Sequence, residues 1–178
     1  MKNKTLLIVL IILIGAFSRI IPHPPNFTAI GAISILGGLY FGKKYLAFII
    51  PFLAMLISDF LLGYKMAISV YLAFLMIIPL GIAIRSKVSH SSIFKTSITA
   101  SIVFFVITNF FVWLGSSPID GIYYCPPNFV GFIKCYTQAI PFFFNTLLGD
   151  LFFCFSLFGL YEVFTKKKFI YLNSWEKY

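Results

Sequence analysis

Charged side chains are scarce in this sequence, and acidic ones are the scarcest. Of its 178 residues, 11% are charged and 60% are hydrophobic, with 14 lysines and arginines against 5 aspartates and glutamates. Soluble domains carry about 25% charged residues. A water-soluble fold of this length cannot enclose so much apolar surface, so the composition excludes a soluble protein and predicts one integral membrane domain.

The sequence also lacks the motifs of common enzymes and metal sites. It contains no HExxH, no GxSxG, no close carboxylate–histidine set, and no CxxC or Cys/His cluster with metal spacing. The segment Gly37–Lys44, GGLYFGKK, resembles a phosphate-binding loop, but Lys44 stands where that loop needs serine or threonine. We therefore expect no enzyme activity, no cofactor, no bound metal and no ATPase site in this chain.

The three cysteines leave two states open. Cys125 and Cys135 flank a predicted loop, whereas Cys154 lies in an apolar run. A Cys125–Cys135 disulfide is compatible with an oxidising side of a membrane. Reduced cysteines that pack against their neighbours are the interpretation that we favour.

Apolar runs separated by proline-rich or basic segments predict an all-α bundle of six membrane-spanning helices. The predicted spans cover residues 5–21, 29–42, 45–63, 66–84, 96–114 and 139–161. The first run has the basic start of a signal peptide, but it lacks a clear cleavage site, so we expect it to remain as a helix. The second run is short and rich in small residues, which lets helix backbones approach closely.

The net charge of +9 comes from short loops rather than from one basic face, so nucleic acid is not the expected partner. With six spans, eleven basic residues fall on one side of the membrane: Lys2, Lys4, Lys43, Lys44, Arg85, Lys87, Lys95, Lys166, Lys167, Lys168 and Lys177. The other side receives three, Arg19, Lys65 and Lys134. By the positive-inside rule, this asymmetry predicts a multi-pass protein of the cell inner (plasma) membrane with both termini in the cytoplasm.

Polar side chains collect in the outer half of the predicted bundle. Asp59 lies in an apolar run, one helical turn before Gly63, and a charge inside hydrocarbon is usually paired, faces a cavity or serves a function. Apolar walls with a few placed polar groups are typical of a small-molecule pocket. The candidate substrate-binding residues are Arg19, Asn26, Asp59, Asn109, Trp113, Asn145 and Asp150.

Most of these candidates also have a purely structural interpretation. Asp59 is equally well placed to form a salt bridge with Arg19 that joins the first and third helices. Asn109 and Asn145 are equally suited to hydrogen bonds between helices. Trp113 is typical of an aromatic residue at the membrane interface.

Asp150 and two proline-rich loops complete the set of candidates. Asp150, near mid-depth, is compatible with a protonated or capped carboxyl group, or with a path for protons or cations. The tetrapeptide PPNF occurs at Pro24–Phe27 and again at Pro126–Phe129, both in predicted outer loops. We expect these two loops to act as paired lids over the pocket.

Several segments together resemble an uncharacterised family of bacterial membrane transport proteins. They are Arg19, PPNFTAIGA (Pro24–Ala32), GGLYFG (Gly37–Gly42), SDFLLG (Ser58–Gly63), FFVITNF (Phe104–Phe110), and IPFF with LGDL (Ile140–Leu151). That family is similar to the S components, the substrate-binding subunits of energy-coupling factor (ECF) transporters. The resemblance covers nearly the whole chain.

The resemblance implies an ECF S-component-like bundle whose outer pocket is closed by the loops after the first, third and fifth helices. It implies capture of a small molecule, a vitamin-like compound or a metal, for transport. The implied partners are the lipid bilayer, a coupling transmembrane subunit and ATPases. The first helix offers only Gly15–Ala16 where many S components present AxxxA to the coupling subunit, so a solitary transporter is an alternative. A further alternative is a non-transporting membrane scaffold or assembly protein whose polar groups lock the helices together.

Overall fold

A computed structural model describes residues 2–41 and 45–165. Over these residues the chain is all-α, as predicted, with six α-helices, two short 3-10 helices and no strand. The elements are α1 (Lys2–Phe17), η1 (Ser18–Ile20), α2 (Ile30–Phe41), α3 (Leu46–Leu62), α4 (Ile68–Ala83), α5 (His90–Gly115), η2 (Pro118–Tyr123) and α6 (Phe129–Thr165).

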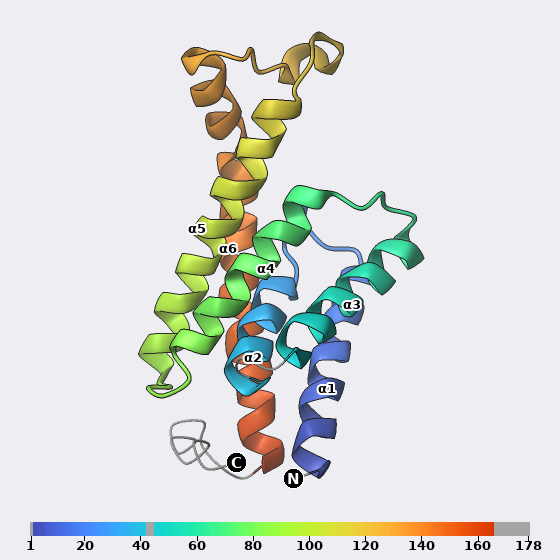
Figure 1. The fold of residues 1–178 in the computed structure, drawn as a ribbon, viewed down its shortest axis with the longest axis vertical. Coiled ribbons are helices and arrows are strands. Elements are labelled where there is room, and N and C mark those ends of the chain that lie inside the picture. Colours follow the sequence, from blue (N-terminus) through green and yellow to red (C-terminus); the bar gives the residue numbers. More distant parts are fainter. Residues whose placement is uncertain (1, 42–44, 166–178) are drawn as a thin grey trace.

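Helix α2 lies at the centre of the bundle, where it packs against α1, α3, α4, α5 and α6 (Figure 1). Its sequence, IGAISILGGLYF, is apolar or small at nearly every position, and all of its residues except Tyr40 are buried. A helix that is apolar on every side is stable only when other elements surround it. With 12 residues it is about 18 Å long, well short of the about 30 Å of a bilayer core.

Two glycines bring α2 and α4 into backbone contact. A Cβ atom added at Gly38 would overlap the carbonyl oxygen of Ile78, and one added at Gly81 would overlap the carbonyl oxygen of Ile35. Because the obstructing atoms belong to helix backbones, no side-chain movement relieves the overlap. The predicted close approach through the small residues of segment 29–42 is confirmed at this crossing.

Helices α5 and α6 form an antiparallel pair that extends beyond α1–α4, with η2 at its far tip (Figure 1). Ser89 caps α5, because its hydroxyl accepts the Ser92 N–H at 3.0 Å while the Ser92 hydroxyl accepts the Ser89 N–H at 2.8 Å. Helix α5 thus begins at residue 90 rather than 96.

The prediction of a loop at residues 115–135 is wrong in its second half, which is helical. Helix α6 begins at Phe129, ten residues before the predicted start at 139. The reason is local, because the side-chain oxygen of Asn128 accepts the N–H of Gly131 at 2.8 Å and so caps the first turn of α6. In the same region the thiols of Cys125 and Cys135 are buried and free, which agrees with the reduced state that we favoured.

The ends of the bundle agree in part with the predicted orientation. Helix α1 begins, α4 meets α5, and α6 ends at one end of the molecule, while η2 lies at the other (Figure 1). The connection at the first end carries Arg85 and Lys87. Residues 42–44 and 166–178, with six of the lysines used in the charge count, lie outside the described residues.

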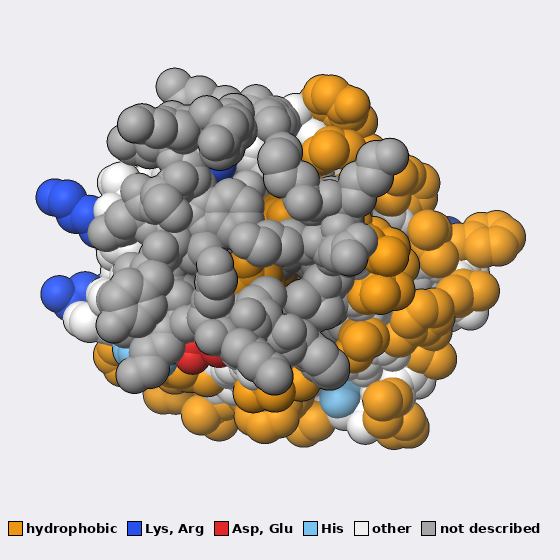
Figure 2. All heavy atoms as spheres, turned by 90° about the horizontal axis from the view of Figure 1, so that it is seen from below, with side chains coloured by type: hydrophobic (Ala, Val, Ile, Leu, Met, Phe, Trp, Pro, Cys, Tyr) orange, Lys and Arg blue, Asp and Glu red, His pale blue; other side chains and the backbone are white. Residues whose placement is uncertain are grey.

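Length and composition single out two helices as able to cross a membrane among the described residues, His90–Gly115 and Phe129–Val163. Helices α2, α3 and α4 are apolar but shorter, and the six predicted spans therefore stay a prediction. The outer surface is nevertheless strongly apolar: on α3, for example, Phe60 is 82% exposed and Leu61 is 57% exposed. Figure 2, seen from the end where α6 finishes, shows hydrophobic side chains along much of the visible rim, with lysine and arginine mainly at one edge.

Candidate functional site

A closed polar network joins the start of the α1–α2 connection to α3 and α4. The Nη1 atom of Arg19 lies 2.7 Å from Oδ1 of Asp59, and the two side chains are 11% and 7% exposed. The same nitrogen donates to the Ser58 hydroxyl at 2.6 Å and lies 3.3 Å from the Met55 sulfur. On the other side, the Tyr71 hydroxyl donates to Oδ2 of Asp59 at 2.8 Å.

This network gives Asp59 the structural partner that was one of its two interpretations. Both carboxylate oxygens are occupied, one by Arg19 and one by Tyr71, so the charge of Asp59 is balanced within the protein. Asp59 lies in the last turn of α3, which ends at Gly63, at φ 68°. The backbone carbonyl of Asp59 accepts the N–H of Tyr64 at 2.9 Å, and this cap holds Asp59 in place.

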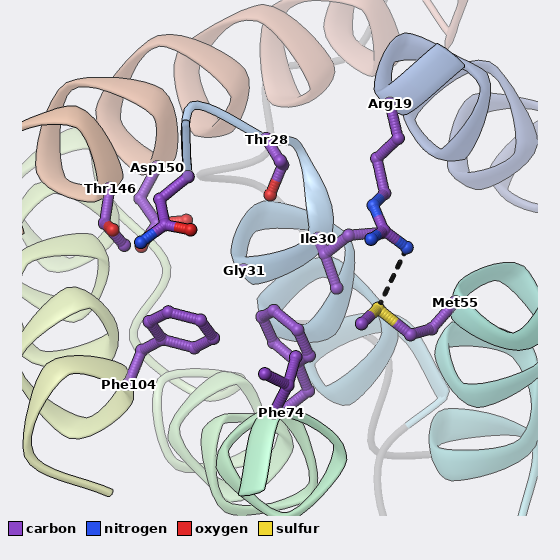
Figure 3. Close-up of a pocket in the computed structure, with 11 residues that line it drawn as sticks. Arg19, Thr28, Ile30, Gly31, Met55, Phe74, Phe104, Thr146 and Asp150 are labelled. Atoms are coloured by element: carbon purple, nitrogen blue, oxygen red, sulfur yellow. Dashed lines mark hydrogen bonds between the residues drawn. The ribbon is translucent and has the colours of Figure 1, made fainter. Parts of the chain in front are cut away.

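Arg19 also lines a cavity, whereas Asp59 does not. The cavity has a volume of about 140 Å³ and lies between α2, α3, α4, α5, α6 and the connection that precedes α2. Figure 3 shows Arg19 and Met55 on one side of it and Asp150, Thr146 and Phe104 on the other. Its lining residues are Arg19, Asn26, Thr28, Ile30, Gly31, Met55, Val70, Phe74, Phe104, Thr146 and Asp150.

A second cavity of about 180 Å³ adjoins the first between α5 and α6. The two share Asn26, Val70, Phe104 and Thr146 in their walls. Asn109 lines the second cavity, with its side-chain amide donating to the carbonyl of Phe105 in its own helix at 2.8 Å. Its interaction is therefore within α5, and its carbonyl oxygen has no hydrogen bond among the described residues.

Asp150 is the most buried candidate and the most closely packed. It is 3% exposed, and its Oδ2 accepts a hydrogen bond from the Ser101 hydroxyl at 2.7 Å. Its other oxygen lies against the first turn of α2, where a Cβ at Gly31 would overlap it. The neighbouring Gly149 allows α6 to approach the backbone of Phe27, whose Cα lies 3.1 Å from where a Cβ would stand. Gly149 and Asp150 are consecutive on α6. The glycine allows the close approach of the backbones, and the carboxylate of Asp150 is thereby held at the cavity wall.

Trp113 and Asn145 do not line either cavity and instead hold loops in place. The indole N–H of Trp113 donates to the carbonyl of Pro126 at 3.0 Å, and its ring packs edge-on against Phe132. The side-chain amide of Asn145 donates to the carbonyl of Pro25 at 3.0 Å. Each residue therefore fastens one of the two PPNF loops to a long helix.

The expectation that the two PPNF loops form paired lids is wrong. Asn26, at φ 66°, lies in the wall of both cavities, so the first loop does border the site. The second loop lies at the tip of the α5–α6 pair, and none of its residues lines either cavity. The two loops differ because the second one serves as the N-cap of α6, which places it at the end of a 37-residue helix.

The structure also brings in residues that sequence reasoning did not select. Phe74 and Phe104, with ring centroids 5.1 Å apart, form the apolar wall opposite Thr28. Thr146 lies one turn before Asp150, and Phe104 lies five residues before Asn109. Helical spacing from Asp150 was an available signal for Thr146, whereas five residues is not a same-face spacing and gave no signal for Phe104.

The geometry defines an all-α protein with a closed ion pair beside a buried cavity that holds a second carboxylate. The chain matches a family described as a family of unknown function (DUF6580) over residues 1–173, and it belongs to that family. No curated protein and no solved structure matches the chain.

Proposed function

We propose that this protein is a six-helix integral membrane protein that captures a small molecule in the outer half of its bundle. In this proposal it serves as the substrate-binding subunit of a transporter, or as a transporter by itself, as the resemblance to ECF S components implies. The observation that carries the proposal is the cavity of about 140 Å³ between Arg19 and Asp150. Polar groups in an otherwise apolar cavity are typical of ligand sites.

The membrane part of the proposal rests on the apolar exterior and on the charge pattern. Large apolar side chains are exposed along helices α3, α5 and α6, which in water would expose hydrophobic surface at a high cost in free energy. Helices α5 and α6 meet the length and composition of spans by themselves. Helix α2 is too short to span a bilayer by itself, but its neighbours enclose it, so its backbone is shielded from lipid.

The orientation is tested by labelling single cysteines in a background without the native three. Ile119, 95% exposed on η2, is expected to react with a membrane-impermeant maleimide added to intact cells when replaced by cysteine. Ser86, exposed in the α4–α5 connection, is expected to react only after the cells are opened. Labelling of both positions in intact cells, or of neither, refutes the orientation.

Ligand capture is tested by native mass spectrometry of the protein released gently from detergent. We expect an adduct of a small organic molecule that disappears when the cavity is filled, for instance by Val70→Phe, and that persists in Leu61→Phe. Leu61 is exposed on α3 and away from both cavities. An adduct that is unaffected by Val70→Phe would place the molecule elsewhere, and its absence in every preparation contradicts capture.

The second candidate function is a membrane scaffold, and the Arg19–Asp59 network favours it. That network is satisfied within the chain and links the α1–α2 connection to α3 and α4, which is what a helix-locking role requires. Co-purification with a coupling subunit and ATPases supports the transport role. Stable capture of other membrane proteins, with no small-molecule adduct, supports the scaffold.

A further inference from the structure

Asp150 is a buried carboxylate without a cationic partner. It is 3% exposed, and no lysine, arginine or histidine forms an ion pair with it among residues 2–41 and 45–165. The Ser101 hydroxyl gives it one hydrogen bond. An isolated carboxylate is costly to bury, and the usual compensations are a counter-charge or several hydrogen bonds. The single hydroxyl of Ser101 is neither a counter-charge nor a set of several hydrogen bonds.

The positive groups in the neighbourhood of Asp150 do not balance its charge. Arg19 lines the same cavity, but its guanidinium is paired with Asp59 at 2.7 Å, so the two form a neutral unit. The first turn of α2, at Gly31, contributes the partial charge of a helix N-terminus, equivalent to about half a unit. An ionised Asp150 carboxylate would therefore give the groups around the cavity a net negative charge, which a cationic ligand would neutralise.

The remaining walls suit the carbon part of a cation. Phe74 and Phe104 line the cavity with their rings inclined at 32° to each other. Figure 3 shows both rings on the same side of the cavity, with Asp150 above Phe104. A cation within about 6 Å of an aromatic face is attracted by the ring quadrupole. The hydroxyls of Thr28 and Thr146, elsewhere in the cavity lining, add acceptors for N–H groups.

The size of the cavity favours an organic cation over a metal ion. Its volume of about 140 Å³ is close to that of a cavity that holds one benzene molecule, about 150 Å³. A single metal ion would leave most of this space empty, and no group of three or more His, Cys, Asp or Glu side chains that would hold a metal occurs in the described part of the chain.

We propose that the cavity binds a small organic ammonium ion, with its N–H groups on the Asp150 carboxylate and its carbon atoms against Phe74 and Phe104. This inference rests on the proposed function and names the chemical class of the ligand. Arg19, whose charge is balanced by Asp59, contributes a neutral part of the wall.

The test uses three probes of nearly equal size and different charge: benzylammonium, benzyl alcohol and benzoate. Their binding to the full-length protein in detergent micelles is measured at pH 7 by isothermal titration calorimetry, with empty micelles as the blank. We expect wild-type protein to bind benzylammonium at least tenfold more tightly than either other probe. Equal or tighter binding of benzyl alcohol or benzoate overturns the inference, and so does the absence of benzylammonium binding.

Two substitutions assign the charge preference to Asp150. Asp150→Asn keeps the shape of the side chain and is expected to weaken benzylammonium binding at least tenfold while leaving benzyl alcohol unchanged. Asp120→Asn, on the exposed η2 segment, is the matched control and is expected to have no effect. Unchanged benzylammonium binding in Asp150→Asn overturns the assignment. If that variant does not fold, the preference of the wild-type protein among the three probes still decides the inference.

The same preparations separate this inference from the proposed function. A co-purified small molecule that is neutral or anionic, displaced by filling the cavity with Val70→Phe, contradicts the ammonium class and leaves ligand capture standing. A co-purified molecule with an amino or quaternary ammonium group supports both. If no small molecule co-purifies and no probe binds, both fail.

Discussion

Replacing Arg19 is expected to destabilise the bundle far more than the loss of a surface charge. In Arg19→Met, Asp59 keeps only the hydroxyl of Tyr71 while its side chain remains 7% exposed. Breaking a buried ion pair by removal of one partner costs about 3–5 kcal/mol, because the remaining charge has no counter-charge. The methionine fills most of the space of the arginine stem, so this cost comes mainly from the stranded carboxylate.

Removing the entire polar network should restore stability, which is a second and stronger prediction. In Arg19→Met/Asp59→Leu/Tyr71→Phe no buried charge remains, and apolar replacement of a buried pair is often neutral or favourable. The triple variant is expected to lie within about 2 kcal/mol of wild type, the uncertainty being the usual cost of imperfect repacking. The Ser58 hydroxyl still donates to the carbonyl of Met55 at 2.8 Å, so it is not left unpaired.

Reversible unfolding by SDS in mixed micelles, followed by circular dichroism, measures these free energies. Lys95→Met, at an exposed position of α5, serves as the control and is expected to change stability by less than about 0.5 kcal/mol. The reasoning is refuted if Arg19→Met costs no more than Lys95→Met. It is equally refuted if the triple variant is as unstable as the single one, since the penalty would then not come from an unpaired charge.

Three further predictions concern packing and loop attachment. Gly31→Ala is expected to destabilise the protein because its Cβ overlaps the Asp150 carboxylate. Gly159→Ala, whose Cβ meets open space, should stabilise α6 by up to about 1 kcal/mol. Equal shifts of the thermal unfolding temperature of the two variants in detergent would contradict this contrast. Asn145→Leu removes the bond to the first PPNF loop, so amide hydrogen exchange of residues 22–28 should accelerate, and unchanged protection there would show that the bond contributes little. Trp113→Phe loses one hydrogen bond, worth about 1 kcal/mol, and should speed exchange at residues 116–128 without weakening benzylammonium binding; weaker binding would mean that Trp113 influences the cavity.

The sequence predicted the fold class and offered the Arg19–Asp59 contact as one of two equal interpretations of Asp59, because both depend on local rules. Apolar runs bounded by prolines and basic residues mark helices wherever they occur. The pairing of Arg19 with Asp59 followed from a carboxylate one turn before a helix end and an arginine at the same predicted depth, since neither charge is stable alone in an apolar layer. The small residues of segment 29–42 predicted a close helix crossing without naming the partner helix, which is α4.

The parts that were missed depend on distances across the bundle. Two identical PPNF segments suggested equivalent lids, but Asn145 holds one beside the cavity while Asn128 places the other at the tip of a long helix pair. Phe74 and Phe104 were hidden among 23 phenylalanines, most of which have no property in the sequence that separates a cavity wall from a lipid-facing position. The lack of a cationic partner for Asp150 among residues 2–41 and 45–165 depends on how all the helices pack together, and no single segment of the sequence contains that information.

The central position of α2 has a consequence for how the chain assembles. Helix α2 leaves the ribosome second, yet α4, α5 and α6, which complete its surroundings, are synthesised later. Because all of its residues except Tyr40 are buried in the folded protein, α2 lacks a complete set of apolar neighbours until those helices have been made. In nascent chains arrested when α2 but not α4 has left the ribosomal exit tunnel, α2 should be open to an added protease, and it should become resistant once α6 has emerged.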